Sequence, residues 1–162
     1  MNYQYTKNYR NSISQNNNYL LTFFHLPKCG GNTLKQILKA NYMTLLCDDF
    51  ASWTELSIIN NFLNIIDKPV GIAGHNTFNI HKILNCSRRV YYITVLREPL
   101  SMLLSKYNYL KSQYQYLPPI EKYIEQATSN WLTKQLGSDD LEKAKKNLLE
   151  YFYIFGLLEY FD

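Results

Sequence analysis

An apolar run leads directly into a glycine-containing turn and then a helix near the start of this chain, and this combination constrains the fold more than any other feature. The segment reads Phe23-Phe24-His25-Leu26-Pro27-Lys28-Cys29-Gly30-Gly31-Asn32-Thr33-Leu34. Glycines let backbone N–H groups turn toward one point, and the N-terminus of a helix carries a partial positive charge. Lys28 adds a full charge beside them. The sequence therefore predicts a site for a phosphate or phosphosulfate group.

The turn lacks one feature of the nucleotide triphosphatase loop. That loop ends in Gly-Lys-Ser/Thr, and its Ser or Thr hydroxyl ligates Mg²⁺. Here Gly-Gly is followed by Asn32. We therefore expect a dianionic group bound without metal, rather than a metal-bound triphosphate.

Two segments of the chain carry a family resemblance. Residues 25–34 resemble the phosphosulfate-binding loop of the carbohydrate sulfotransferases, notably the heparan sulfate 2-O/6-O type and its bacterial relatives. Residues 95–107 resemble the segment in which this family holds the 3′-phosphate of its donor nucleotide. Two shorter segments, 74–78 and 147–162, are similar to later parts of the family domain. All four occur in the family's order.

The resemblance implies a donor, a reaction and a set of contacts. The donor is 3′-phosphoadenosine 5′-phosphosulfate, used without metal, and a carbohydrate hydroxyl accepts the sulfuryl group. Lys28 is expected to stabilise the leaving 5′-phosphate, while Arg97 and Ser105 hold the 3′-phosphate. The residues expected to surround the 5′-phosphosulfate are Cys29, Gly30, Gly31, Asn32, Thr33 and Leu34.

The chain departs from the family pattern in three places. Asn32 replaces a Thr or Ser, and Met102 stands where the family often has Arg or another polar residue. Family domains also continue past the position of Asp162. We therefore expect a sulfotransferase-like domain over residues 19–162 that is incomplete at its C-terminus.

The acceptor base is expected to be His75. It resembles the histidine of the family's Gly-His segment, which serves as the base in the 2-O type, and histidine can exchange a proton near neutral pH. A merely hydrogen-bonded structural role is the alternative. Asp49 and Glu55 are fallback bases, His81 is expected on a helix surface, and His25 is expected to pack at the strand end.

The cysteines indicate neither a disulfide framework nor a zinc site. Cys29, Cys47 and Cys86 form an odd set without Cys-x-x-Cys spacing, which points to a reducing compartment. Cys29 at a helix N-terminus invites a phosphatase interpretation with a lowered thiol pKa. That signature needs Arg six residues later, where this chain has Lys35. The nucleophile interpretation is therefore disfavoured.

Charge and hydropathy narrow the partners. The net charge is +4 over 162 residues, with the lysines scattered, which disfavours nucleic-acid binding. No apolar run approaches the roughly 18 residues of a membrane span. We expect a cytoplasmic protein whose partners are the nucleotide donor and a glycan. The sequence gives no indication of the oligomeric state.

Alternating patterns predict a three-layer α/β sandwich with a central parallel sheet, of the P-loop nucleoside triphosphate hydrolase-like class. Residues 1–18 are polar and aperiodic, and are expected to form a mobile leader. The expected strands are 20–25, 43–47, 70–73, 90–96 and 153–157. The expected helices are 32–41, 53–66, a helix from 99, 120–136 and a final helix to 152.

The helices carry more detailed expectations. Apolar residues on one side of the third helix predict that it faces the core, namely Leu100, Leu103, Leu104, Tyr107 and Tyr114. Leu34, Ile37 and Leu38 are expected to do the same for the first helix. Asp139 and Glu142 have capping-box spacing at the start of the last helix.

Two other functions compete with sulfuryl transfer. The first is a non-catalytic remnant that binds the donor nucleotide or a partner, which the short C-terminal region favours. The second is a small P-loop kinase, which the missing Gly-Lys-Ser/Thr and the lack of a Mg²⁺-binding acid after a strand disfavour.

Overall fold

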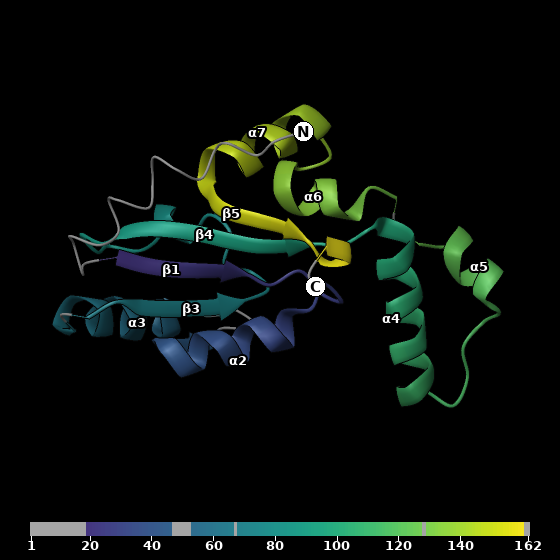
Figure 1. The fold of residues 1–162 in the computed structure, drawn as a ribbon, viewed down its shortest axis with the longest axis horizontal. Coiled ribbons are helices and arrows are strands. Elements are labelled where there is room, and N and C mark those ends of the chain that lie inside the picture. Colours follow the sequence, from purple (N-terminus) through teal and green to yellow (C-terminus); the bar gives the residue numbers. More distant parts are fainter. Residues whose placement is uncertain (1–18, 47–52, 67, 128, 161–162) are drawn as a thin grey trace.

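The computed structural model describes residues 19–46, 53–66, 68–127 and 129–160, and joins the strands of these ranges in one five-stranded parallel sheet (Figure 1). Their order is β2 (Met43–Leu46), β3 (Val70–Gly74), β1 (Tyr19–Phe24), β4 (Arg89–Leu96) and β5 (Phe152–Leu157). Phe24 at the end of central β1 lies opposite Gly74 of β3 and Thr94 of β4. Three strands therefore end close together, at the edge where parallel sheets bind ligands.

Helices connect these strands. They are α2 (Gly31–Asn41), α3 (Trp53–Ile65), α4 (Pro99–Gln113), α5 (Ile120–Glu125), α6 (Trp131–Gly137) and α7 (Leu141–Tyr151). Two short 3-10 turns are η2 (Ile80–Lys82) and η3 (Leu158–Tyr160). The predicted leader, residues 1–18, lies outside the described residues.

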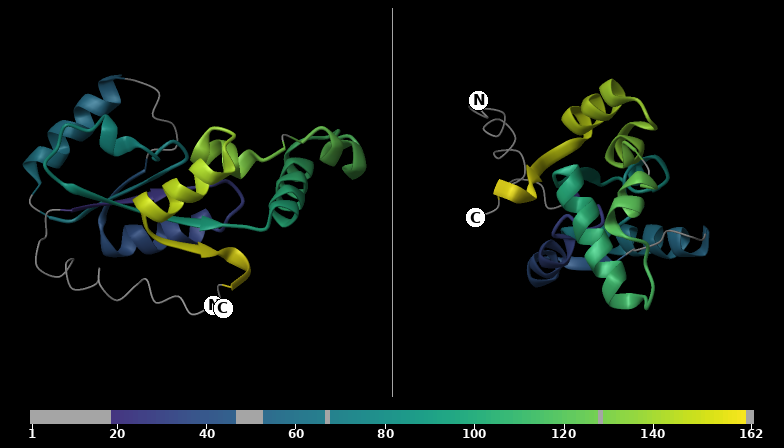
Figure 2. Two further views of the ribbon diagram at one scale, coloured as in Figure 1. Left: turned by 90° about the horizontal axis from the view of Figure 1, so that it is seen from above. Right: turned by 90° about the vertical axis from the view of Figure 1, so that its right-hand side faces the viewer.

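Helices cover both faces of the sheet (Figure 2). On one face Leu38 of α2 forms a small buried cluster with Phe23 and Ala73. On the other, Leu63 of α3 and Leu136 of α6 join a larger cluster, together with α7. The chain moves outward from β1 to β2 through α2 and returns to β3 through α3, so two right-handed crossovers must lie on opposite faces. The predicted three-layer α/β fold with a central parallel sheet is confirmed, and the β1–turn–α2 unit lies at its centre.

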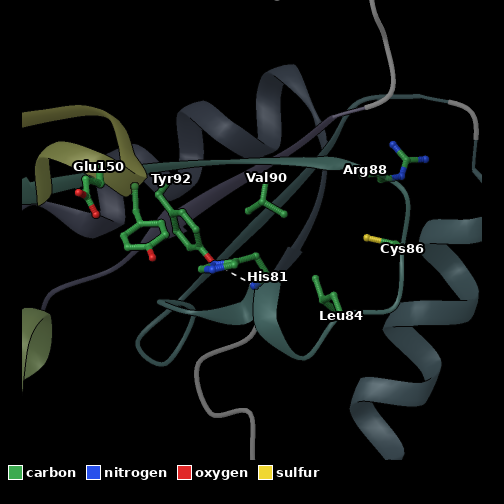
Figure 3. Close-up of a pocket in the computed structure, with 8 residues that line it drawn as sticks. His81, Leu84, Cys86, Arg88, Val90, Tyr92 and Glu150 are labelled. Carbon is green, nitrogen blue, oxygen red and sulfur yellow. Dashed lines mark hydrogen bonds between the residues drawn. The ribbon is translucent and has the colours of Figure 1, made fainter. Parts of the chain in front are cut away.

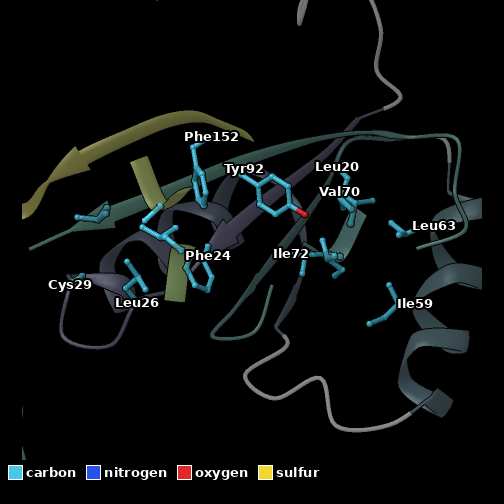
Figure 4. Close-up of a cluster of buried hydrophobic side chains, with 14 residues drawn as sticks. Leu20, Phe24, Leu26, Cys29, Ile59, Leu63, Val70, Ile72, Tyr92 and Phe152 are labelled. Carbon is cyan, nitrogen blue, oxygen red and sulfur yellow. The ribbon is translucent and has the colours of Figure 1, made fainter. Parts of the chain in front are cut away.

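The larger cluster forms the main core (Figure 4). Leu20 and Phe24 of β1 point into it, whereas Phe23 points toward α2, because neighbouring strand side chains face opposite sides. Tyr92 and Phe152 extend the cluster across β4 and β5. Burial on both faces explains why the strands read as nearly unbroken apolar runs.

One predicted helix, 120–136, is two helices. α5 ends at Glu125, and α6 begins at Trp131. Asn130 has a φ of 56°, a left-handed conformation that a continuous α-helix cannot contain. Apolar periodicity does not register a single residue of this kind, which is why the prediction was wrong.

The predicted core-facing stripe of α4 is also wrong. No residue of α4 is buried, Leu100 and Leu104 are exposed, and Tyr114 follows the helix and is exposed. α4 stands across the end of the sheet instead of lying along one face (Figure 1). A helix at the end of the strands has little sheet surface to cover.

One predicted core residue of α2 is also exposed, namely Ile37.

The predicted cap of the last helix is displaced by one residue. The carboxylate of Asp140, not Asp139, accepts the N–H of Lys143 at 2.9 Å. Asp139 has a left-handed φ of 74° and belongs to the preceding turn. The cap still satisfies a helix-terminal donor, as an Asp in this position is expected to do.

A buried arginine joins three segments at the opposite end of the strands, where β1 and β4 begin. Arg88, directly before β4, is 7% exposed. Its guanidinium donates to four backbone carbonyls, those of Leu63 (3.0 Å), Lys68 (2.7 Å), Tyr19 (3.4 Å) and Ile66. Three of these carbonyls belong to the end of α3 and the residues that follow it, and the fourth starts β1. One side chain therefore closes the C-terminus of α3 and joins it to two strands.

We expect Arg88→Lys to lower the free energy of unfolding by about 2–4 kcal/mol. Lysine carries no planar fork that can reach carbonyls on several sides, so buried acceptors lose their donor. Urea denaturation followed by circular dichroism measures the change. Arg89→Lys is the matched control, because exposed Arg89 lies over the Tyr91 ring at 5.2 Å and lysine can keep that contact. Equal losses in the two variants would contradict the assignment.

Candidate functional site

The turn between β1 and α2 has an unusual backbone. Lys28 has a φ of 64° and Gly30 a φ of 74°. Glycine adopts this conformation without cost, but a lysine there is uncommon and costs roughly 1 kcal/mol. Surrounding contacts must hold Lys28 in place, and strain of this kind concentrates at functional sites.

The start of α2 is open to a ligand. Its N-cap is Gly30, which has no side chain to accept the first N–H groups, and the first turn carries no acidic residue. Asn32 and Thr33 are exposed there, while Leu34 packs partly into the core. By contrast, α4 is capped by Glu98 and α7 by Asp140. The orphan N–H groups of α2 are therefore open to an anion, whereas the first N–H groups of α4 and α7 are already bound to carboxylates.

Two stacked histidines lie against this turn. A Cβ on Gly31 would fall 1.9 Å from the ring of His25, so the imidazole lies directly on the first residue of α2. His75 stacks on His25 with ring centres 4.3 Å apart. The expected packing role of His25 is confirmed, and the structure places His75 one ring away from the turn.

A hydrogen bond determines which nitrogen of His75 carries its proton. Nδ1 lies 2.7 Å from the carbonyl oxygen of His25. A carbonyl can only accept, so Nδ1 must donate, and neutral His75 therefore has its lone pair on Nε2. His75 is half-buried. This tautomer leaves Nε2 as the atom that can accept a proton.

Two buried threonines hold the ends of the strands. The Thr77 hydroxyl lies 3.0 Å from the carbonyl of Phe23 and 3.1 Å from that of Gly74. The Thr94 hydroxyl donates to the carbonyl of Phe24 at 2.8 Å. These bonds hold β1, β3 and β4 in register where the turn begins. Sequence analysis assigned no role to either residue. Thr94 lies in an apolar run and Thr77 in the polar segment after β3, and nothing in the sequence around them marks a bond to a strand carbonyl.

Arg97 connects the segment 95–107 to the glycine turn of segment 25–34. Its Nη1 donates to the carbonyl of Lys28 at 3.0 Å, so the residue that follows β4 supports the strained turn after β1. Its Nε lies 3.8 Å from a carboxylate oxygen of Glu159. The two segments predicted to hold the two donor phosphates are therefore in direct contact.

The face of α4 that looks toward the turn carries Ser105. Lys28 Nζ lies 4.4 Å from the centre of the Tyr109 ring, a cation–π contact. Ser105 lies one helical turn before Tyr109 and Met102 about one turn earlier, so all three share this face. Met102 packs partly against the core, which explains an apolar residue at that position. Tyr109 was missed, because nothing local marks a contact with so distant a residue.

Cys29 is not a reactive thiol. Its side chain is 1% exposed, and burial raises the pKa of the thiol to about 11. The Arg97 charge opposes this rise but does not overcome it. A thiolate is therefore scarce near neutral pH, and the lowered pKa of the phosphatase interpretation is wrong.

Among the remaining histidine and acid candidates, the structure corrects the expected position of His81 and does not describe two acidic side chains. His81 is half-buried, not simply on a helix surface. Its Nδ1 lies 2.8 Å from the Tyr92 hydroxyl and its ring stacks on Tyr151. Burial, and then the charge of Lys82, lower its pKa. Asp49 and the side chain of Glu55 lie outside the described residues.

His81 lines a cavity of about 280 Å³ (Figure 3). None of the residues that line this cavity belongs to the glycine turn. The cavity borders Val90 and Tyr92, in the first half of β4, whereas Arg97 follows the end of that strand. A second hollow, of about 440 Å³, lies along α2 and begins near the N-terminus of that helix. It is lined by Asn32, Thr33, Lys35, Gln36 and Lys39, and its two lysines make it positive.

The described ranges contain neither a metal-binding cluster nor a membrane-spanning helix. No group of three or more His, Cys, Asp or Glu side chains is arranged to hold a metal ion there. In the same part of the chain, no helix has the length and apolar character needed to cross a membrane.

Comparison with known proteins does not identify a family for this chain. No family model matches the chain, and no curated protein shows significant similarity to it. Among solved structures it is similar to a gluconokinase from Sinorhizobium meliloti 1021, at 8% identity and a TM-score of 0.41, over 83% of this chain and 94% of that one. Similarity of this degree carries no information on substrate or reaction.

We expect Gly31→Ala to lower the free energy of unfolding by about 1–3 kcal/mol, because the Cβ of alanine must displace the His25 ring. This loss is expected even though alanine favours helices more than glycine does. Replacing His25 by alanine as well restores the space. The double variant Gly31→Ala/His25→Ala should therefore lose less unfolding free energy than the two single variants together, by about 1 kcal/mol. Urea denaturation of the four proteins measures this coupling. Asn32→Ala, at an exposed neighbour, should change stability by less than about 0.5 kcal/mol. Additive losses would contradict the close contact.

Proposed function

We propose that this chain transfers the sulfuryl group of 3′-phosphoadenosine 5′-phosphosulfate to a carbohydrate hydroxyl. The observation that carries the proposal is the bond between Arg97 and the Lys28 carbonyl. It brings two cationic residues together while leaving them on separate segments. Two anion positions of this kind suit a nucleotide with phosphates on both its 5′ and 3′ oxygens.

The residues divide the work as follows. The acceptor oxygen attacks sulfur, and the bond from sulfur to the bridging phosphate oxygen breaks. Negative charge develops on the leaving 5′-phosphate, where Lys28 and the open N–H groups of α2 can stabilise it. The acceptor proton passes to Nε2 of His75. Arg97 and Ser105 hold the 3′-phosphate and so position the donor.

We expect 3′,5′-adenosine bisphosphate to stabilise the chain without metal, and ATP to do so weakly with or without Mg²⁺. A ligand at about 100 times its Kd should add about 2.7 kcal/mol to the free energy of unfolding. Thermal shift and calorimetry measure both ligands. Equal shifts for the two ligands, or a strict Mg²⁺ requirement, would favour the kinase alternative.

Lys28→Ala and Arg97→Ala should each weaken bisphosphate binding by at least about tenfold, because each variant loses a charged contact to a phosphate. Lys106→Ala is the control for the first, since Lys106 is an exposed lysine next to Ser105. Arg89→Ala is the control for the second. Parent-like affinity in Lys28→Ala or Arg97→Ala would remove the site.

His75→Ala should separate binding from chemistry. We expect bisphosphate affinity to stay within about twofold of the parent, while turnover falls about a hundredfold or more, because the acceptor loses its base. Sulfate transfer to a panel of glycans measures turnover, and calorimetry measures binding. His81→Ala, assayed where it is folded, should keep parent-like turnover. Unchanged turnover in His75→Ala would remove the assignment, and a parent that binds but transfers nothing would favour the non-catalytic alternative.

A further inference from the structure

The short turn η3 lies over both segments of the proposed donor site. Leu158 packs against the glycine turn, since a Cβ on Gly30 would fall 2.8 Å from its Cδ1. The next residue, Glu159, reaches Arg97. One of its carboxylate oxygens lies 3.8 Å from Arg97 Nε and accepts the backbone N–H of Glu98 at 3.1 Å.

The carboxylate of Glu159 occupies one side of the Arg97 guanidinium. On another side, Nη1 already donates to the Lys28 carbonyl. Nε is buried and has no hydrogen-bond acceptor in the described structure, so Glu159 faces it from just beyond bonding distance. The guanidinium and the Glu98 N–H together form a small anion site, and the chain's own carboxylate fills it.

We propose that Glu159 is a specificity-determining residue of the donor site, which sets how strongly the chain distinguishes a 3′-phosphorylated adenine nucleotide from one with a free 3′-hydroxyl. This inference rests on the proposed function. A dianionic phosphate on Arg97 must either displace the carboxylate or accept its repulsion. Both lower the affinity for the bisphosphate. Neither affects a nucleotide whose single phosphate goes to the Lys28 turn.

The surroundings of Glu159 allow displacement. Its side chain is 37% exposed, and Tyr160 beside it is exposed as well. When the carboxylate swings into solvent, the Glu98 N–H becomes free to donate to the incoming phosphate, next to Arg97. The same two groups that now bind Glu159 would then bind the 3′-phosphate.

Glu159→Gln tests the inference with little change in shape, because the amide oxygen can still accept from Glu98. Calorimetry should show 3′,5′-adenosine bisphosphate binding about tenfold or more tightly than to the parent, with 5′-AMP unchanged within about twofold. Glu142→Gln is the charge-matched control, since Glu142 is an exposed acid of α7, and it should change neither affinity. Equal or weaker bisphosphate binding by Glu159→Gln overturns the inference, as does an equal gain for both nucleotides.

The parent reports on the proposed function separately. If it binds neither nucleotide, the donor assignment fails, and inorganic sulfate then becomes the probe of the Arg97 site. Stabilisation of Glu159→Gln at about tenfold lower sulfate than the parent, by thermal shift, still supports Glu159 as the competing anion. The same sulfate response in both proteins overturns it.

Discussion

The close approach of the His25 ring to Gly31 determines the geometry at the carboxyl edge of the sheet. Only glycine leaves room for an imidazole at the first residue of α2, so the chain can turn sharply after β1 and start a helix at once. The same ring provides the surface on which His75 stacks. The turn also directs the carbonyl of strained Lys28 toward Arg97, whose guanidinium donates a hydrogen bond to it. The packing contact between His25 and Gly31 thus organises residues that follow three strands.

Negative charge is distributed unevenly over the helix starts at this edge. At α4, Glu98 accepts the N–H groups of Leu100 and Ser101, which lower the pKa of its carboxyl group, and Glu159 accepts the N–H of Glu98 itself. At α2 the cap is Gly30, and the first turn carries no acid. An incoming anion therefore meets little competition at α2 but meets a resident carboxylate beside Arg97. This asymmetry is a physical reason why the two phosphate positions that we propose would differ in selectivity.

Buried polar contacts make the site rigid. Thr77 and Thr94 bind carbonyls at the ends of β1 and β3. At the opposite end of the strands, Arg88 binds the carbonyl of Tyr19, which begins β1, and carbonyls at the end of α3 and in the residues that follow it. Each satisfies acceptors that would otherwise be buried without a donor. Lys28 in the turn and His75 directly after β3 are therefore carried by strand ends that these contacts hold in place. The more exposed α4 brings Tyr109 and Ser105 to the same place with fewer constraints, since none of its residues is buried.

The amino-acid sequence by itself determined the α/β class, the positions of the strands, and the β1–turn–α2 unit, because apolar runs, glycines and helical periodicity act over a few residues. It also predicted Lys28, His75 and Arg97 as residues that follow strands. Only the tertiary structure decided what surrounds them: the stack of His75 on His25, Tyr109 over Lys28, and Glu159 beside Arg97. It also decided the break at Asn130 and the exposure of α4. These depend on contacts between residues distant in the chain and on single backbone conformations, and neither leaves a periodic trace in the sequence.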